Sequence, residues 1–160
     1  MKYIGAFIII IASVLLSGEY SRYIKKRAEQ CEEWLSFIGY MRVQISCFLR
    51  PSREIAIGFS GVELEKIGFL KAVNDGESLY GAYKATEKSL ALTLEEREIV
   101  ETLFFSIEEC YLDVGIKIID SAYEEMEKAC LIIREERPKN VKLAATLSVT
   151  ASIGFLILIL

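Results

Sequence analysis

The chain has 160 residues, which is about the length of one domain. Of these residues 52% are hydrophobic, and 23 acidic side chains against 19 basic ones leave a formal net charge of −4, with no histidine. The acidic balance argues against nucleic-acid binding, which needs a basic face. The missing histidine removes the side chain that most often performs general acid–base catalysis.

Two apolar segments lie at the ends of the chain. Residues 3–16 read YIGAFIIIIASVLL, and residues 143–160 read LAATLSVTASIGFLILIL. The second carries no charge over 18 residues, which lets a helix cross roughly 30 Å of hydrocarbon. The first reaches that length only by continuing through Ser17, Gly18 and the stretch Glu19-Tyr20-Ser21, with Tyr20 and Tyr23 at the interface. We therefore predict an N-terminal membrane anchor over residues 1–23 and a C-terminal transmembrane helix over residues 141–160.

The shortness of the first segment leaves a second interpretation open. A cleaved secretory signal would have Lys2 in its charged region and small residues near Ser17 and Gly18. The basic residues that follow favour an uncleaved anchor, because positive charge after an apolar segment opposes export.

Basic residues flank an acidic middle region on both sides. Residues 28–133 hold 20 acidic and 10 basic side chains, a net charge of −10. The flanking basic residues are Arg22, Lys25, Lys26, Arg27, Arg134, Arg137, Lys139 and Lys142. Such residues stay on the cytoplasmic side and attract anionic lipid headgroups. We expect a multi-pass protein of the cell membrane that contacts membrane lipid, exposes residues 24–137 to the cytoplasm and has both termini outside.

The middle region has the pattern of a helical bundle. Residues 24–48 form a predicted helix that ends before Pro51. We expect it to continue from the anchor as one long helix. Its apolar positions from Cys31 recur at steps of three and four, which is typical of a helix that packs on partners. These positions are Cys31, Trp34, Ile38, Met41, Ile45 and Phe48. Shorter helices are predicted over residues 52–59, 62–73 and 78–90.

The strongest local signal for a helix start is the sequence from Thr93 to Glu96. This T-x-x-E pattern is a capping box, and it predicts a helix that ends near Ser106. The last helix of the domain has a regular seam from Leu112 to Ile133, after which Pro138 predicts a kink or a short break. The predicted fold class is all-α, a bundle of about five or six helices flanked by an N-terminal and a C-terminal transmembrane helix.

Residues able to carry chemistry are scarce. The four cysteines form no close pair, so we expect no zinc site and take them as small buried hydrophobic residues. No phosphate-binding or nucleophile motif occurs, so we expect no catalysis and no cofactor. Clustered carboxylates are typical of solvated helix faces but are candidates for an acidic interaction surface. These are Glu108, Glu109, Asp113, Glu124, Glu125 and Glu127.

The order and length of the elements resemble the stage III sporulation protein AB family. The likeness covers nearly the whole chain, and four segments carry it. They read YIGAFIIIIASVLLSGEYSRYIKKR, MRVQISCFLRPSREIA, LYGAYKA and LEEREIVETLFFSI. The chain departs from the family where Phe105-Ser106-Ile107-Glu108 replaces a Leu-Gly and Ser-Asp sequence, and where Tyr83 replaces a tryptophan.

The resemblance implies a specific role. The soluble part of that family is similar to the cytoplasmic domain of type II secretion and type IV pilus platform proteins. The chain would then belong to a channel complex that links mother cell and forespore, on the mother-cell side of the outer forespore membrane. Its helical domain would dock a companion motor ATPase and other subunits of the complex.

Other roles stay open on the residues alone. One is a two-span helical adaptor or signalling protein unrelated to sporulation, with the bundle as a homo-oligomerisation module. Another is an exported helical protein with a cleaved signal and a C-terminal anchor.

Overall fold

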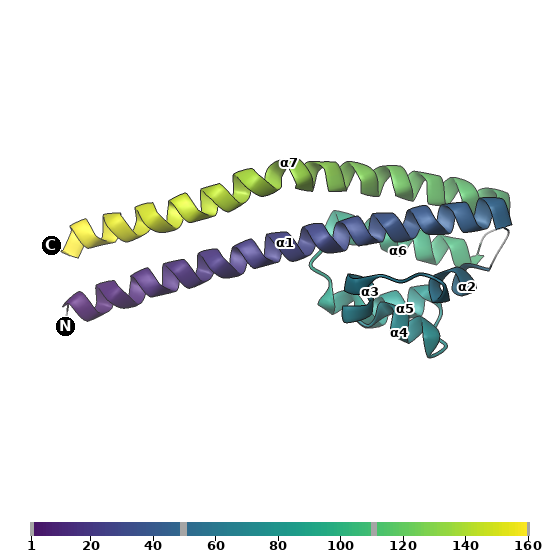
Figure 1. Cartoon of the computed structure of the whole chain (residues 1–160), viewed down its shortest axis with the longest axis horizontal. Coiled ribbons are helices and arrows are strands. Elements are labelled where there is room, and N and C mark those ends of the chain that lie inside the picture. Colours follow the sequence, from purple (N-terminus) through teal and green to yellow (C-terminus); the bar gives the residue numbers. More distant parts are fainter. Residues whose placement is uncertain (1, 49–50, 110–111, 160) are drawn as a thin grey trace. The chain divides into compact units, whose positions relative to one another are not determined.

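The computed structural model describes residues 2–48, 51–109 and 112–159, with side chains described at fewer positions near the ends and around residues 108–113 (Figure 1). All of the elements in these ranges are helical, which confirms the predicted all-α class. In chain order they are α1 (Lys2–Phe48), α2 (Ser52–Ile57), α3 (Val62–Lys66), α4 (Phe69–Asn74), α5 (Leu79–Thr86), the 3-10 turn η1 (Glu87–Ser89), α6 (Leu94–Glu109) and α7 (Leu112–Ile159).

The chain divides into two compact units. One comprises residues 1–26 and 133–160, and the other comprises residues 27–132. Helices α1 and α7 each contribute to both units, and α1 has no break between the predicted anchor and the domain. Within the described residues, no helix combines the length and the apolar composition needed to cross a membrane. The two membrane segments therefore stay a prediction.

The core of residues 27–132 is built around Trp34. Its indole makes edge-on or tilted contacts with four rings that come from α1, α4, α5 and α6, at centroid distances of 5.0–6.3 Å. These rings belong to Phe37, Phe69, Tyr83 and Phe104, and all five aromatic side chains are fully buried. Edge-to-face packing adds to the stabilisation from burial. The seam predicted on α1 is confirmed from Cys31 to Ile45, whereas the side chain of Phe48 lies outside the described residues.

Helices α1 and α7 pack side by side in this unit and run in opposite directions. The Arg42 guanidinium is 2.6 Å from a carboxylate oxygen of Asp120 and lies 5.5 Å above the Tyr123 ring. Gly39 lets the helices approach closely, because a Cβ there would lie 3.1 Å from the Tyr123 ring. Closer to the ends of the chain, Cys31 of α1 meets Cys130 of α7.

Three sequence-based boundaries were wrong. The single helix predicted over residues 62–73 is two helices, because Gly68 adopts a left-handed conformation with φ of +89° between α3 and α4. The helix predicted over residues 78–90 ends at Thr86 and tightens into η1. At Pro138, where a kink or a short break was predicted, helix α7 continues without a break, so the missing amide donor is tolerated inside the helix.

Candidate interaction site

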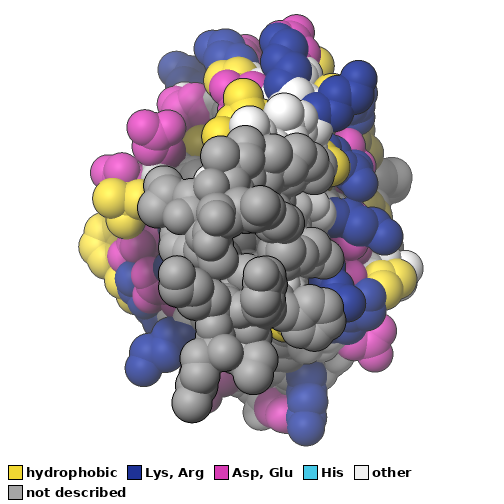
Figure 2. All heavy atoms as spheres, turned by 90° about the vertical axis from the view of Figure 1, so that its left-hand side faces the viewer, with side chains coloured by type: hydrophobic (Ala, Val, Ile, Leu, Met, Phe, Trp, Pro, Cys, Tyr) yellow, Lys and Arg dark blue, Asp and Glu magenta, His cyan; other side chains and the backbone are white. Residues whose placement is uncertain are grey.

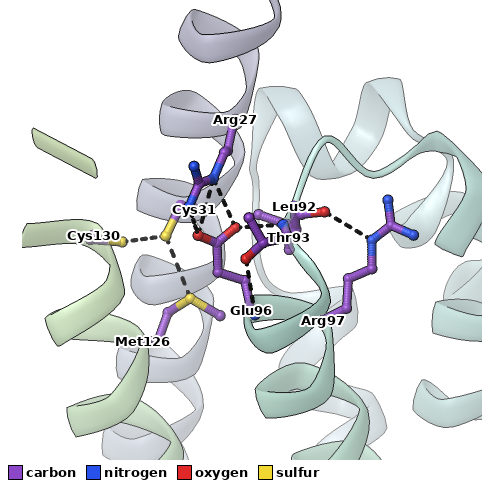
Figure 3. Close-up of polar contacts among 8 residues, drawn as sticks. All are labelled: Arg27, Cys31, Leu92, Thr93, Glu96, Arg97, Met126 and Cys130. Carbon is purple, nitrogen blue, oxygen red and sulfur yellow. Dashed lines mark hydrogen bonds and ion pairs between the residues drawn. The ribbon is translucent and has the colours of Figure 1, made fainter. Parts of the chain in front are cut away.

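The start of α6 is fixed by the predicted capping box. The backbone N–H of Thr93 donates to Glu96 Oε2 at 2.8 Å, and the N–H of Glu96 donates to Thr93 Oγ1 at 3.4 Å (Figure 3). This reciprocal pairing satisfies two amide donors that the first turn of a helix leaves without partners. The capping-box prediction is confirmed.

The same carboxylate also pairs with α1. The Arg27 Nε–H donates to both oxygens of Glu96, at 3.1 and 3.2 Å, and a terminal nitrogen of Arg27 makes a third contact (Figure 3). The Glu96 side chain is 3% exposed and that of Arg27 is 20% exposed, so the pair is largely removed from water. Desolvation offsets much of the attraction in such a pair, whereas loss of one partner would leave a largely buried charge. Glu96 thus joins the helix start to α1.

Three sulfur atoms gather one turn further along α1. Cys31 Sγ lies 2.7 Å from Cys130 Sγ and 3.6 Å from Met126 Sδ, both on α7 (Figure 3). Both thiols are buried, as predicted. The hydrogen bond with Cys130, followed by burial, raises the pKa of the Cys31 thiol. Cys47, in contrast, is exposed, so its predicted burial was wrong, and Cys110 lies outside the described residues.

A groove with a volume of about 650 Å³ runs between α6 and α7 beside this cluster. Its apolar lining includes Ile99 and Leu103 from α6 and Ile118, Ala122, Ala129 and Ile132 from α7. The small side chains of Ala122 and Ala129 take up little of the space along this part of α7. Among the described residues, no side chain fills this space between the two helices.

The edge of the groove is acidic. Glu95 and Glu98 on α6 and Glu125 on α7 line it and are exposed, and Lys128 is an exposed cation among them. The positive charge of Arg27 is offset by Glu96, to which it is paired. The groove therefore offers an apolar lining with a net negative edge.

Of the predicted acidic surface, one residue takes part in this groove. Glu125 lines it and accepts a hydrogen bond from Ser121 Oγ at 3.2 Å. Glu124 and Glu127 are exposed on α7 outside its lining. The side chains of Glu108, Glu109 and Asp113 lie outside the described residues.

The predicted flanking basic residues separate into two groups. Arg27 belongs to the helical domain through Glu96. The others lie in the unit formed by the chain ends, where Arg22 pairs with Glu19 at 2.7 Å and Lys25, Arg137 and Lys142 line a hollow of about 450 Å³. Lys26, Arg134 and Lys139 are exposed. Figure 2 shows many Lys and Arg side chains at the surface that it presents, intermixed with Asp and Glu.

Sequence analysis placed Glu96 in the capping box and gave Glu95 and Glu98 no functional role, so the part of these residues in the groove was missed. Glu95 and Glu96 lie in the first turn of α6, where negative charge is favourable. The available signal was on α7, where the small residues Ala122 and Ala129 alternate with the larger Ile119, Met126 and Ile133.

Comparison with known proteins identifies a family. The model of a family described as stage III sporulation protein AB matches residues 2–160. No curated protein and no solved structure matches the chain. Because the family model covers all but the first residue, the chain belongs to the stage III sporulation protein AB family, and its role lies in sporulation.

Proposed function

We propose that the chain is a non-enzymatic, membrane-anchored platform of a sporulation complex, and that the groove between α6 and α7 docks a companion motor ATPase. The observation that carries the proposal is the groove, with its apolar lining and its edge of Glu95, Glu98 and Glu125. Family membership supports the sporulation setting. The choice of an ATPase as the partner rests on an analogy, namely the likeness of the family to secretion platform proteins.

The chemistry of the groove favours one kind of partner segment. A groove between two helices accepts the apolar face of an amphipathic helix, with side chains spaced at three and four residues. Exposed carboxylates along the edge favour lysine or arginine beside that face, because complementary charge raises the association rate and selects partners. We therefore expect the ATPase to present a basic amphipathic helix.

The direct test is binding between the full-length chain in detergent micelles and the purified ATPase. We expect Ala129→Trp, which fills the groove, and Glu98→Lys, which reverses charge at its edge, each to weaken affinity at least about tenfold. Glu124→Lys is the matched control, since it makes the same charge change on an exposed residue of α7 outside the groove lining. Equal weakening by Glu124→Lys, or no effect of Ala129→Trp, would refute docking in the groove.

The membrane part of the proposal rests on the sequence. Residues 3–16 and 143–160 are apolar, and basic residues follow the first and precede the second. These features favour two spans with the domain in the cytoplasm.

Cys47 provides a reporter for this topology, because its thiol is exposed in the domain. In a Cys110→Ser background, a maleimide that cannot cross membranes should label Cys47 in inverted vesicles and not in intact cells. Labelling in intact cells would place the domain outside. Sequencing of the mature N-terminus completes the test, because loss of residues 1–17 would establish a cleaved signal.

A cellular measurement connects the groove to sporulation. We expect Ala129→Trp at the native locus to lower the number of heat-resistant spores while the protein level stays normal, and Glu124→Lys to leave spore number unchanged. Normal sporulation in a strain that lacks the chain would refute the platform role.

A further inference from the structure

Among the described residues of the domain, the closest contact between two sulfur atoms joins α1 to α7. Cys31 Sγ and Cys130 Sγ are 2.7 Å apart, although 99 residues separate them in the sequence. Disulfide bonds have a sulfur–sulfur distance of about 2.05 Å, so a small side-chain movement would bring the two sulfurs to bonding distance. The two residues are 0% and 6% exposed.

We propose that Cys31 and Cys130 form a reversible disulfide site that cross-links α1 to α7, with a small-molecule disulfide such as oxidised glutathione as the oxidant. Neither cysteine lines the ATPase groove, although Cys130 directly follows Ala129, which does. The proposal gives these two cysteines a role in forming a covalent bond, whereas the sequence analysis took them as small buried hydrophobic residues.

The exchange proceeds in two steps. One cysteine thiolate attacks a sulfur of the oxidant, forms a mixed disulfide and releases one small thiolate. The second cysteine thiolate then attacks the protein sulfur of the mixed disulfide and releases the other small thiolate. The two protons of the cysteine thiols end on the released thiolates. The cysteine pair thus loses two electrons, and the oxidant is reduced to two thiols.

Burial determines when this exchange can happen. A thiolate is the nucleophile, and the buried Cys31 thiol is held in its protonated form by the hydrogen bond with Cys130 and by desolvation. Access for the oxidant therefore requires local opening of α1 from α7, or a chain that has not yet closed its bundle. Reduction of the finished disulfide needs the same local opening, so burial slows the exchange in both directions.

The cross-link should stabilise the bundle strongly, because it closes a long loop in the unfolded chain. Disulfides that close loops of about 100 residues are among those with the largest expected effect. We expect the oxidised chain to unfold at a Tm higher by on the order of 10 °C than the reduced chain.

The test uses the full-length chain in detergent micelles, carrying Cys47→Ser and Cys110→Ser so that Cys31 and Cys130 are its remaining thiols. The chain is unfolded in urea and refolded with oxidised glutathione, and free thiols are counted with N-ethylmaleimide after denaturation. Peptide mapping without reduction identifies the cross-link. Cys130→Ala in the same background is the control.

We expect no free thiols, one intramolecular peptide pair joining Cys31 to Cys130, the rise in Tm, and slower oxidation of the native chain than of the refolding chain. The control should retain a thiol or carry glutathione. Two free thiols after refolding, glutathione on both cysteines, or cross-links between separate chains would overturn the proposal. Binding of the ATPase is measured separately with the reduced chain. A failure of the disulfide and a failure of docking are thereby distinguished.

Discussion

Arg27 and Glu96 form a largely buried ion pair between α1 and the first turn of α6, although 69 residues separate them. The carboxylate has two roles, because it also accepts the N–H of Thr93 in the capping box. A local helix-start signal and a long-range contact therefore share one side chain. The two roles can be separated by substitution.

Glu96→Ala should lower the free energy of unfolding by about 3 kcal/mol, since it removes a helix cap and leaves a mostly buried guanidinium without its carboxylate. Glu96→Gln keeps the shape and the acceptor of a capping box, so it should cost less than Glu96→Ala. Urea unfolding followed by circular dichroism measures both. Equal losses of unfolding free energy in the two variants would show that the capping hydrogen bond contributes nothing beyond the ion pair.

A double-mutant cycle isolates the ion pair itself. Arg27→Met alone leaves the buried Glu96 carboxylate without the guanidinium, whereas Arg27→Met with Glu96→Gln removes both charges. We expect the second change to recover part of the loss, with a coupling energy of about 1–3 kcal/mol. Strict additivity would contradict the pairing.

Gly68→Ala should destabilise the domain by about 1–2 kcal/mol, because a Cβ is strained at a φ of +89°. Gly115→Ala is the matched control, since Gly115 lies inside α7 and no described heavy atom stands within 4 Å of an added Cβ. That substitution should stabilise the helix by roughly 0.5–1 kcal/mol. Opposite shifts of the unfolding midpoint would confirm the left-handed turn, and shifts of the same sign would contradict it.

A fragment of residues 27–132 should fold alone. This unit contains the aromatic core around Trp34 and the Arg27–Glu96 pair, and it excludes both apolar ends. We expect a water-soluble helical fragment with a single cooperative unfolding transition, observed both by circular dichroism and by Trp34 fluorescence. Transitions that differ between the two probes would show that the core depends on the chain ends.

Patterns local in sequence predicted most of the fold. The steps of three and four residues identified Cys31, Trp34 and Ile38 as core, and all three are buried. The turn at Gly68 was missed because Leu64 and Phe69, on either side of it, both face the core, so the apolar pattern continues across the break.

The candidate site was less predictable, because its contacts join distant parts of the chain. Arg27 was assigned to the membrane edge from its neighbours in sequence, yet its partner is Glu96. The closeness of Cys31 and Cys130 depends on how α1 and α7 align, which spacing within either helix does not determine. Local periodicity fixes which side of a helix is buried, and the partner across the interface depends on packing.

The domain should lose stability in alkaline solution, and Tyr83 should account for part of that loss. Its buried hydroxyl donates to the Arg97 carbonyl at 2.9 Å, and burial, followed by the charges of Glu87 and Glu101, raises its pKa above the usual value near 10. The folded state thus holds the phenolic proton more tightly than the unfolded chain. Stability from this group is complete below about pH 10 and declines as the pH rises further.

Tyr83→Phe measures this contribution. At neutral pH it should cost about 1 kcal/mol, the typical value of a buried neutral hydrogen bond, and it should flatten the fall in stability above about pH 10. Lys84 is the control, because its hydrogen bonds with Glu101 and Glu87 also raise its pKa and its deprotonation acts in the same direction. Lys84→Gln should leave the Tyr83 part of the alkaline slope in place. An unchanged slope in Tyr83→Phe, measured as the unfolding midpoint in urea from pH 8 to pH 11, would contradict the assignment.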